Sequence, residues 1–317
     1  HDPSRMAGGS SSGSGAAVGA GMVPLALGSD TNGSIRVPAS FCGVFGLKPT
    51  YGRLSRFGSF PFCDSLDHLG PFAHSARDLA LAYDVMQGPG AGDAASAERP
   101  VEPSLPTLED GISDLRCALL GGFFSTDGMP EAEAAVRAVT RALDITAQVE
   151  AEGVEAGRAA AFIITNVESA NLHMANLQSR VDEFAPDTRD RFLAGALLPG
   201  TWYVRAQQVR KWYRDRFNRL FREFDILIAP ATPFTAPEIG QRMIEIRGKA
   251  VLTRPNIGMF TQPISAIGLP VCCVPVRTGR LPIGVQIIAP PWREDLCLRV
   301  AAALEKTDAL GELGPAR

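Results

Sequence analysis

Short apolar runs bounded by proline, glycine or charged residues recur along the chain. Their length of six or seven residues and their composition are typical of buried β-strands, and they occupy residues 116–121, 225–230, 270–275 and 283–289. Apolar residues at helical spacing predict helices at residues 130–143 and at about 201–222. This alternation predicts an α/β fold with a partly parallel sheet.

Capping and turn residues set further boundaries. Ser75 is a residue type typical of a helix N-cap, and Gly88 is typical of a helix end. Together they predict a helix that runs from Ser75 to about Gln87. Residues 14–27 predict a tight helix followed by a short buried strand, and residues 301–310 predict a closing helix. The Pro- and Gly-rich stretch 88–106 is either a surface loop or a linker between domains.

Composition narrows the class of protein. The 317 residues are 45% hydrophobic and 21% charged, which excludes a disordered or collagen-like chain. The net charge of −3 gives no reason to expect a nucleic-acid or anionic-membrane partner. The helix at 201–222 is rich in arginine, and we expect a solvated face paired with nearby acids in preference to a contact with RNA or an acidic partner.

Cysteine and histidine usage argues against metal or disulfide chemistry. The six cysteines have no C-x-x-C spacing, and the four histidines have no paired spacing. We expect buried free thiols, a reducing and therefore cytoplasmic location, no metal and no cofactor. No apolar run reaches the roughly 20 residues that a membrane-spanning helix needs.

A glycine- and serine-rich segment, residues 8–14, is the first candidate site. Alone it resembles a flexible linker. It also contains a G-x-S-x-G pattern centred on Ser11, but the hydrophobic strand that a hydrolase nucleophile elbow requires does not precede it. A phosphate-binding loop would need a following G-K-[ST] motif, which is missing.

The second candidate is the turn at residues 28–38. Consecutive Thr31, Asn32, Gly33 and Ser34 allow several backbone N–H groups to converge on one point, a geometry that suits an oxyanion. Ser34 at the end of the turn could then attack a carbonyl carbon held there. Asp30 and Arg36 bracket the turn and could pair to stiffen it; Arg36 contacting a substrate is the alternative.

The two serine-bearing segments, 24 residues apart, resemble those of the amidase signature family. The resemblance covers essentially residues 1–317 and implies one large mixed β-sheet covered by helices on both faces. It also implies a Ser–Ser–Lys device, with Ser34 as nucleophile, Ser10 as the bridging serine after a cis peptide bond, and an oxyanion hole of backbone N–H groups from Thr31 to Ser34. Ser11 is a further neighbour of this pair, and Ser12 and Asn32 stand where the family usually or often has glycine.

The lysine of that device is not matched. In the family it lies upstream of the first serine segment, where this chain has no lysine; Lys48 belongs to a shared motif but not to the catalytic position. We therefore expect the chain to lack an N-terminal segment that carries it. Asp67 and His68 could suggest half of a Ser–His–Asp triad, but no histidine is catalytic in the family, so we expect both to be structural or to line a pocket.

Further segments, among them 29–40, 65–71 and 224–233, are similar to those of family members that hydrolyse a terminal ureido amide. This similarity implies ammonia release from a small-molecule ureido or amide substrate and a small helical partner subunit. Two alternatives stay open. One is the amidase subunit of a glutamyl-tRNA amidotransferase, and the other is a non-catalytic scaffold subunit, suggested by the unmatched lysine.

Overall fold

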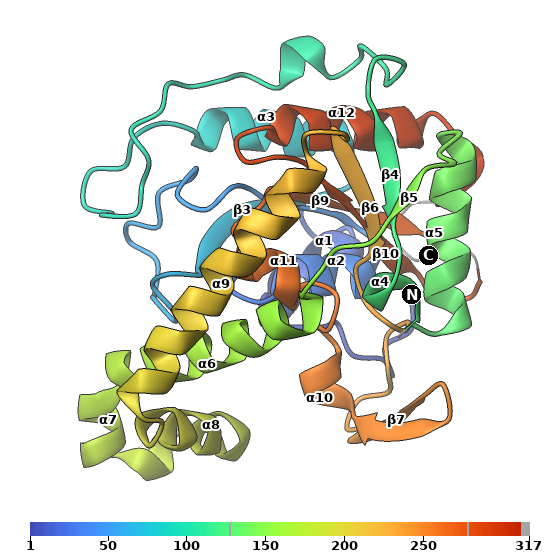
Figure 1. Cartoon of the computed structure of the whole chain (residues 1–317). Helices are drawn as coiled ribbons and strands as arrows, with labels where there is room; N and C mark the ends of the chain where they lie inside the picture. The colour runs from blue at the N-terminus through green and yellow to red at the C-terminus, as the bar shows by residue number, and fades with distance from the viewer. Residues whose placement is uncertain (127, 278, 312–317) are drawn as a thin grey trace.

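An eight-stranded mixed sheet forms the centre of the protein (Figure 1). The structure is a computed structural model that describes residues 1–126, 128–277 and 279–311. In these residues the strand order is β1-β3-β2-β9-β10-β6-β4-β5, and only β4 runs parallel to its neighbours β5 and β6. The strands are β1 (Leu25–Asp30), β2 (Phe45–Lys48), β3 (His68–Ala73), β4 (Cys117–Leu120), β5 (Gln148–Val149), β6 (Ile226–Pro230), β9 (Val271–Val276) and β10 (Ile283–Ile288).

Strand pairing joins the two ends of the chain in this one sheet. Lys48 of β2 pairs with Val271 of β9, and Cys273 of β9 pairs with Gln286 of β10. The stretch 88–106 therefore connects α3 (Ala76–Met86) to β4 of the same sheet, and the interpretation of it as an inter-domain linker is wrong. The predicted α/β class with a large mixed sheet is confirmed.

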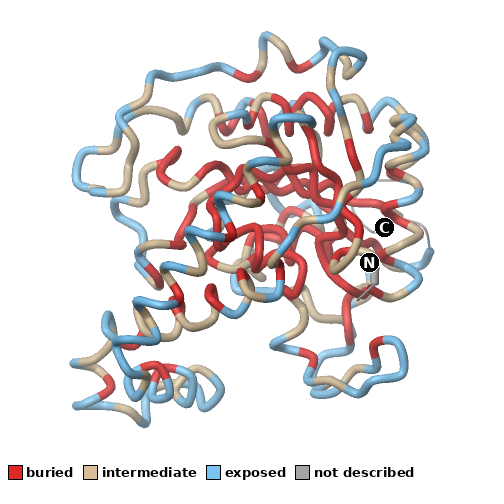
Figure 2. Tube along the Cα trace, viewed as in Figure 1, coloured by how far each residue is buried: buried red, intermediate tan, exposed pale blue. Residues whose placement is uncertain are grey.

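Helices cover both faces of the sheet. One face carries α3 (Ala76–Met86), α5 (Pro130–Ala142) and α12 (Glu294–Glu305), and the other carries α1 (Ser12–Gly19), α2 (Arg36–Cys42), α6 (Val154–Leu172), α9 (Gly200–Leu220) and α11 (Gln262–Ala266). Because successive strand residues point to opposite faces, Ile226 and Ile228 join the first layer's core while Leu227 and Ala229 join the second. Both cores are buried around the central strands (Figure 2).

Smaller elements lie around this framework. Beyond the far ends of α6 and α9, the helices α7 (Met174–Ser179) and α8 (Pro186–Ala196) extend the second layer (Figure 1). The remaining elements are α4 (Phe123–Thr126), α10 (Thr253–Asn256), the hairpin of β7 (Met243–Ile246) and β8 (Lys249–Leu252), and the short 3-10 helices η1 (Leu105–Thr107), η2 (Val181–Glu183) and η3 (Asp308–Leu310).

Most predicted elements form, and the differences have physical causes. The Ser75 hydroxyl accepts a hydrogen bond from the Asp78 N–H, so it caps α3 as expected. The strand after α1 was expected to be buried, but β1 lies at the sheet edge and alternates exposed and half-buried residues up to a buried Asp30. The closing helix begins at Glu294, earlier than the predicted residue 301.

The arginine-rich helix α9 has the solvated, paired face that was expected. Lys211 pairs with Asp215 at 2.6 Å, and Arg216 pairs with Glu152. Arg210 points inward instead and donates to the backbone oxygens of Ser65 and Ala266.

The six cysteines are all free, and five of them are buried. This agrees with the expectation of unpaired thiols. Among the described helices, none combines the length and the apolar character needed to cross a membrane.

Candidate active site

The first serine segment is a tight loop that leads into α1. The Gly9–Ser10 peptide bond is cis, as the resemblance implies. Gly8 has φ +86°, and a Cβ there would lie 3.0 Å from the Pro38 backbone, so the loop rests directly on α2. The Ser11 hydroxyl lies 3.1 Å from both the N–H and the oxygen of Ser29, which ties the loop to β1.

Ser10 and Ser34 are brought to the same place by this packing. The Ser11 N–H donates to the Ser34 backbone oxygen at 3.4 Å, so the two serine segments touch at Ser34 and at the residue after Ser10. Ser10 is exposed and Ser34 is half-buried. In the described chain neither hydroxyl hydrogen-bonds to another residue, which leaves both oxygens available to a further group.

Asp30 organises the second segment from the end of β1. Its carboxylate accepts the N–H groups of Gly33 at 2.7 Å and Ile35 at 3.2 Å, and this folds residues 31–35 into a turn. The Gly33 N–H is thus occupied in this structure, and its place in the oxyanion hole stays a prediction. The N–H groups of Asn32 and Ser34 have no acceptor in the described chain and remain candidates, together with that of Thr31.

Arg36 is a structural residue of this turn. Its side chain is fully buried, and all five N–H donors are used: two on the Asp30 carboxylate, and the others on Thr261, Ser265 and Gln286. The expected Asp30–Arg36 pair therefore forms, and Arg36 has no donor left for a substrate. Burial acts to raise the pKa of Asp30, but the adjacent Arg36 charge outweighs it and holds that pKa well below its usual range.

Each remaining residue of the turn is fixed by a different neighbour. The Thr31 hydroxyl donates to Asp67 at 2.5 Å, and the Asn32 side-chain amide donates to Thr165 of α6 at 2.8 Å. Gly33 has φ +130°, and a Cβ there would lie 2.1 Å from the Thr261 hydroxyl, so only glycine fits. Three elements distant in sequence thus hold the turn.

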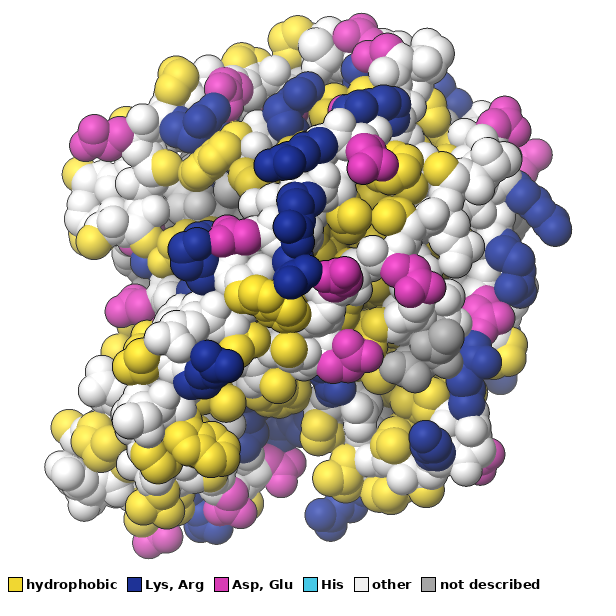
Figure 3. All heavy atoms as spheres, viewed as in Figure 1, with side chains coloured by type: hydrophobic (Ala, Val, Ile, Leu, Met, Phe, Trp, Pro, Cys, Tyr) yellow, Lys and Arg dark blue, Asp and Glu magenta, His cyan; other side chains and the backbone are white. Residues whose placement is uncertain are grey.

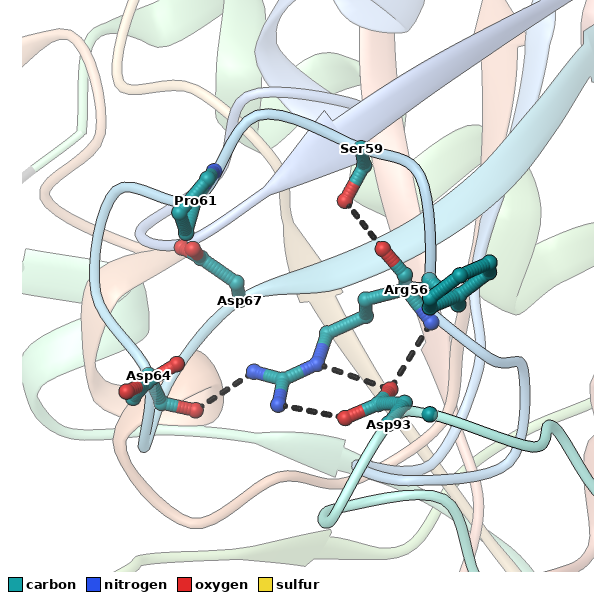
Figure 4. A pocket seen from close by; sticks show the side chains of 8 residues that line it. Arg56, Ser59, Pro61, Asp64, Asp67 and Asp93 are labelled. Carbon is teal, nitrogen blue, oxygen red and sulfur yellow. Dashed lines mark hydrogen bonds and ion pairs between the residues drawn. The ribbon is translucent and has the colours of Figure 1, made fainter.

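Asp67 also shapes a small hollow beside the turn (Figure 4). Its second oxygen accepts the N–H groups of Phe62 and Cys63, and burial raises the pKa of this carboxyl. Arg56 faces the hollow but is held by both oxygens of Asp93, at 2.9 and 3.1 Å. The Arg56 guanidinium that lines this hollow of about 120 Å³ is therefore already neutralised by the Asp93 carboxylate.

Asp67 and His68 do not form part of a triad. The His68 Nδ1 atom lies 2.6 Å from the Leu66 oxygen and 3.0 Å from the Asp30 oxygen, and burial keeps the pKa of the imidazole well below its usual value. In the described chain no hydrogen bond connects His68 to Asp67, Ser10 or Ser34. The structural roles expected for both residues are consistent with these contacts.

Lys48 is the one buried lysine of the described chain. Burial lowers the pKa of its ammonium to about 7, and it donates to the Pro49 oxygen at 2.9 Å. Within the described ranges no hydrogen bond connects it to either serine. Among the described residues there is also no group of histidine, cysteine and acidic side chains that could hold a metal ion.

Comparison with known proteins decides the family. Residues 1–298 match the family model described as Amidase. The chain belongs to the amidase family. Amidases hydrolyse amide C–N bonds, and the paired serine segments described above are where this amidase has its candidate catalytic groups.

Individual relatives divide into two groups. This amidase is 53% identical to AtzE, which is one of the subunits of the 1-carboxybiuret hydrolase of Pseudomonas sp. (strain ADP), over 97% of this chain and 68% of that protein. It is 37% identical to a glutamyl-tRNA(Gln) amidotransferase subunit of Thermus thermophilus, over 98% of this chain and 70% of that protein.

Solved structures give the same picture. A chain from a structure described as a vestigial protein complex that reveals the evolutionary origins of an s-triazine catabolic enzyme superposes with a TM-score of 0.97 at 52% identity, covering 99% of this chain and 69% of that one. The corresponding amidotransferase subunit of Thermotoga maritima gives a TM-score of 0.85 at 31% identity, covering 98% and 70%.

Sequence reasoning did not single out Thr165, Thr261, Ser265 or Gln286, although all four hold the turn that carries Ser34 or its residue Arg36. Gln286 carried a usable signal, since a lone amide inside the apolar run 283–289 must find partners when buried. Thr165 had no such signal, because α6 itself was not predicted.

Proposed function

We propose that this amidase hydrolyses the terminal C–N bond of a ureido amide with release of ammonia, and that its substrate is 1-carboxybiuret. The observation that carries the proposal is the 53% identity, across 97% of the chain, to one of the subunits of a 1-carboxybiuret hydrolase. The Asn32-containing turn, in which a side-chain amide reaches α6, adds local support because many family members have glycine there.

In the proposed reaction the Ser34 oxygen attacks the terminal carbonyl carbon. Its proton passes to Ser10, and Ser10 passes its own proton to a neutral lysine. The negative charge on the carbonyl oxygen is stabilised by backbone N–H groups of the turn. Ammonia leaves with a proton returned along the same route, and water then releases the carbamoyl group from Ser34.

We further propose that the lysine lies in a segment N-terminal to residue 1. The edge strand β1 supports this, because in the described chain it pairs only with β3 and exposes Leu25 and Leu27. The hydroxyls of Ser14 and Ser11 already bond to the backbone of Leu27 and Ser29 in β1, so a preceding segment would cover the two leucine side chains by packing against them and not by continuing the sheet along that stretch. Such a segment would lie next to Ser11, which is bonded to β1.

We propose that the partner subunit is a small helical protein. A hollow of about 290 Å³ between α6 and α9 is lined mainly by alanine, Ile163, Trp202 and Val209, and Trp202 is 56% exposed. Exposed Arg205, Lys211 and other basic residues of α9 lie beside it, and Figure 3 shows Lys and Arg side chains along this helix. An amphipathic helix with an acidic face would match both features. The free thiols support a reducing compartment, which we take to be the cytoplasm.

The test is ammonia release by the full-length protein, co-expressed with any small neighbouring subunit. The substrate would be 1-carboxybiuret made in situ by a cyanuric-acid ring-opening hydrolase, with Ser34→Ala as control and glutamine as the competing substrate. Ammonia from the ureido substrate alone supports the proposal. Ammonia release from glutamine would favour the amidotransferase function. No ammonia from either substrate, in a protein with no upstream lysine, would favour the scaffold function.

A further inference from the structure

The side-chain amide of Asn32 has one polar atom that makes no hydrogen bond within the described chain. Its Nδ2 group donates to the Thr165 hydroxyl, which itself donates to the Ala161 oxygen in the same helix. Because the Thr165 proton is directed at Ala161, only the NH2 end of the Asn32 amide can face Thr165. This chain of two hydrogen bonds fixes the orientation of the amide, and its oxygen must point elsewhere.

That oxygen, Oδ1, is buried and has no hydrogen-bond partner in the described chain. The residue as a whole is half-buried, so part of Asn32 is open to solvent although this oxygen is not. A buried carbonyl oxygen without a donor is costly and uncommon, and such a group is usually completed by water or a ligand. Asn32 lies two residues before Ser34, so the unpaired oxygen belongs to the same turn as the proposed nucleophile.

Ureido and alkyl amides differ at the atom next to the scissile carbonyl. In a ureido amide that atom is an N–H group that stays on the acyl side when ammonia leaves. In the glutamine side chain it is a CH2 group, which cannot donate. From the geometry we propose that Asn32 Oδ1 accepts a hydrogen bond from this N–H and makes Asn32 the residue that selects ureido over alkyl amides. The inference rests on the proposed function and names the determinant of its substrate class.

The expected selectivity follows from the unpaired oxygen. With a CH2 group in place of N–H, Oδ1 stays buried without a donor, so the alkyl ligand loses a hydrogen bond and leaves the desolvation cost in place. Losses of this kind correspond to about a tenfold to hundredfold difference in affinity. Replacing Asn32 by glycine or alanine removes the oxygen and should remove the difference.

Biuret and malonamide form a matched pair of probes, because they differ only in a central N–H or CH2 group. Both would be measured as competing ligands against 1-carboxybiuret hydrolysis by the full-length protein, so that neither has to be turned over. We expect the Ki of malonamide to exceed that of biuret by about tenfold or more in the wild type. The ratio should fall to near one in Asn32→Ala and Asn32→Gly.

Thr165→Ser is the control variant. It keeps the hydroxyl that accepts from Nδ2 and so keeps the amide in its orientation, and the ratio should stay within about threefold of the wild type. Equal collapse in Thr165→Ser and Asn32→Ala would overturn the inference, because disturbance of the contact to α6 and not loss of Oδ1 would then explain the selectivity. A wild-type ratio below tenfold, or an unchanged ratio in Asn32→Ala, would also overturn it. Absence of ammonia from 1-carboxybiuret in the wild type would instead refute the proposed function.

Discussion

The buried pair of Asp30 and Arg36 allows a quantitative test of how the turn that carries Ser34 is held. Asp30→Asn keeps the shape of the side chain but replaces one carboxylate oxygen by an NH2 group. Each carboxylate oxygen faces several donors, including the Gly33 N–H on Oδ1 and the Ile35 N–H on Oδ2. In either orientation of the new amide, its NH2 group therefore faces N–H donors of the turn and of Arg36. The substitution also leaves the Arg36 charge without a counter-charge in the core.

Both side chains of the pair are 0% exposed, so water cannot compensate for the lost carboxylate. Removing one partner of such a pair costs about 3–5 kcal/mol of unfolding free energy. Asp225→Asn is the matched control, because Asp225 holds Arg116 through the same two-point contact at 2.9 and 3.0 Å but the side chains are 29% and 55% exposed. We expect a loss of about 1 kcal/mol or less there.

Chemical denaturation of both variants, followed by circular dichroism, measures the difference. The Asp30 carboxyl has a depressed pKa in the folded state, so its contribution is present above the usual value of 3.8 and is lost as the pH falls through the folded-state pKa. The gap between wild type and Asp30→Asn should therefore be constant near neutral pH and shrink in strong acid. A loss in Asp30→Asn no larger than in Asp225→Asn would refute the reasoning.

Three further substitutions probe the same region. Thr31→Val leaves a buried oxygen of the Asp67 carboxylate without its donor and should cost about 1–3 kcal/mol of stability and lower kcat. Thr31→Ser keeps the hydroxyl and should restore both, so equal defects in the two variants would show that the hydroxyl does not matter. Gly33→Ala brings a Cβ to 2.1 Å from the Thr261 hydroxyl at φ +130°, so we expect loss of ammonia release and a lower Tm, with Gly200→Ala, which meets no atom within 4 Å, as the unaffected control. Burial lowers the pKa of Lys48 to about 7 from 10.5, so the buried ammonium destabilises the folded state fully below pH 7, and this destabilisation is relieved as the pH rises to 10.5. Lys48→Met should therefore be more stable than the wild type at pH 7 but gain little at pH 10.5, as denaturation at both pH values would show.

The sequence predicts the central strands of the fold well because their apolar runs are short and bounded by Pro or Gly. The runs at 225–230 and 270–275 became β6 and β9 within a residue of the prediction. Helix α6 was missed because its alanine-rich sequence, buried on several sides, has a weak amphipathic pattern. Its high content of helix-forming residues was the signal that could have identified it.

For the candidate site, local motifs predict what lies within the turn but not what surrounds it. The Asp30–Arg36 pair spans six residues and was predicted from spacing alone. The occupancy of the Gly33 N–H was not, because spacing does not reveal which side of a turn a carboxylate takes. Thr165 and Thr261 reach the turn from 133 and 229 residues away, and such contacts are set by packing of the whole fold.

The saturated guanidinium of Arg36 has a consequence for the order in which the protein matures on the ribosome. Three of its five donors end on Thr261, Ser265 and Gln286, which the ribosome adds more than two hundred residues after Arg36. Until β10 has emerged, the Arg36 guanidinium lacks these three hydrogen-bond acceptors, and the turn that carries Ser34 is not fully held. The serine centre, encoded among the first residues of this chain, is therefore among the last parts to assemble, and a nascent chain stopped before residue 286 should not hydrolyse amides.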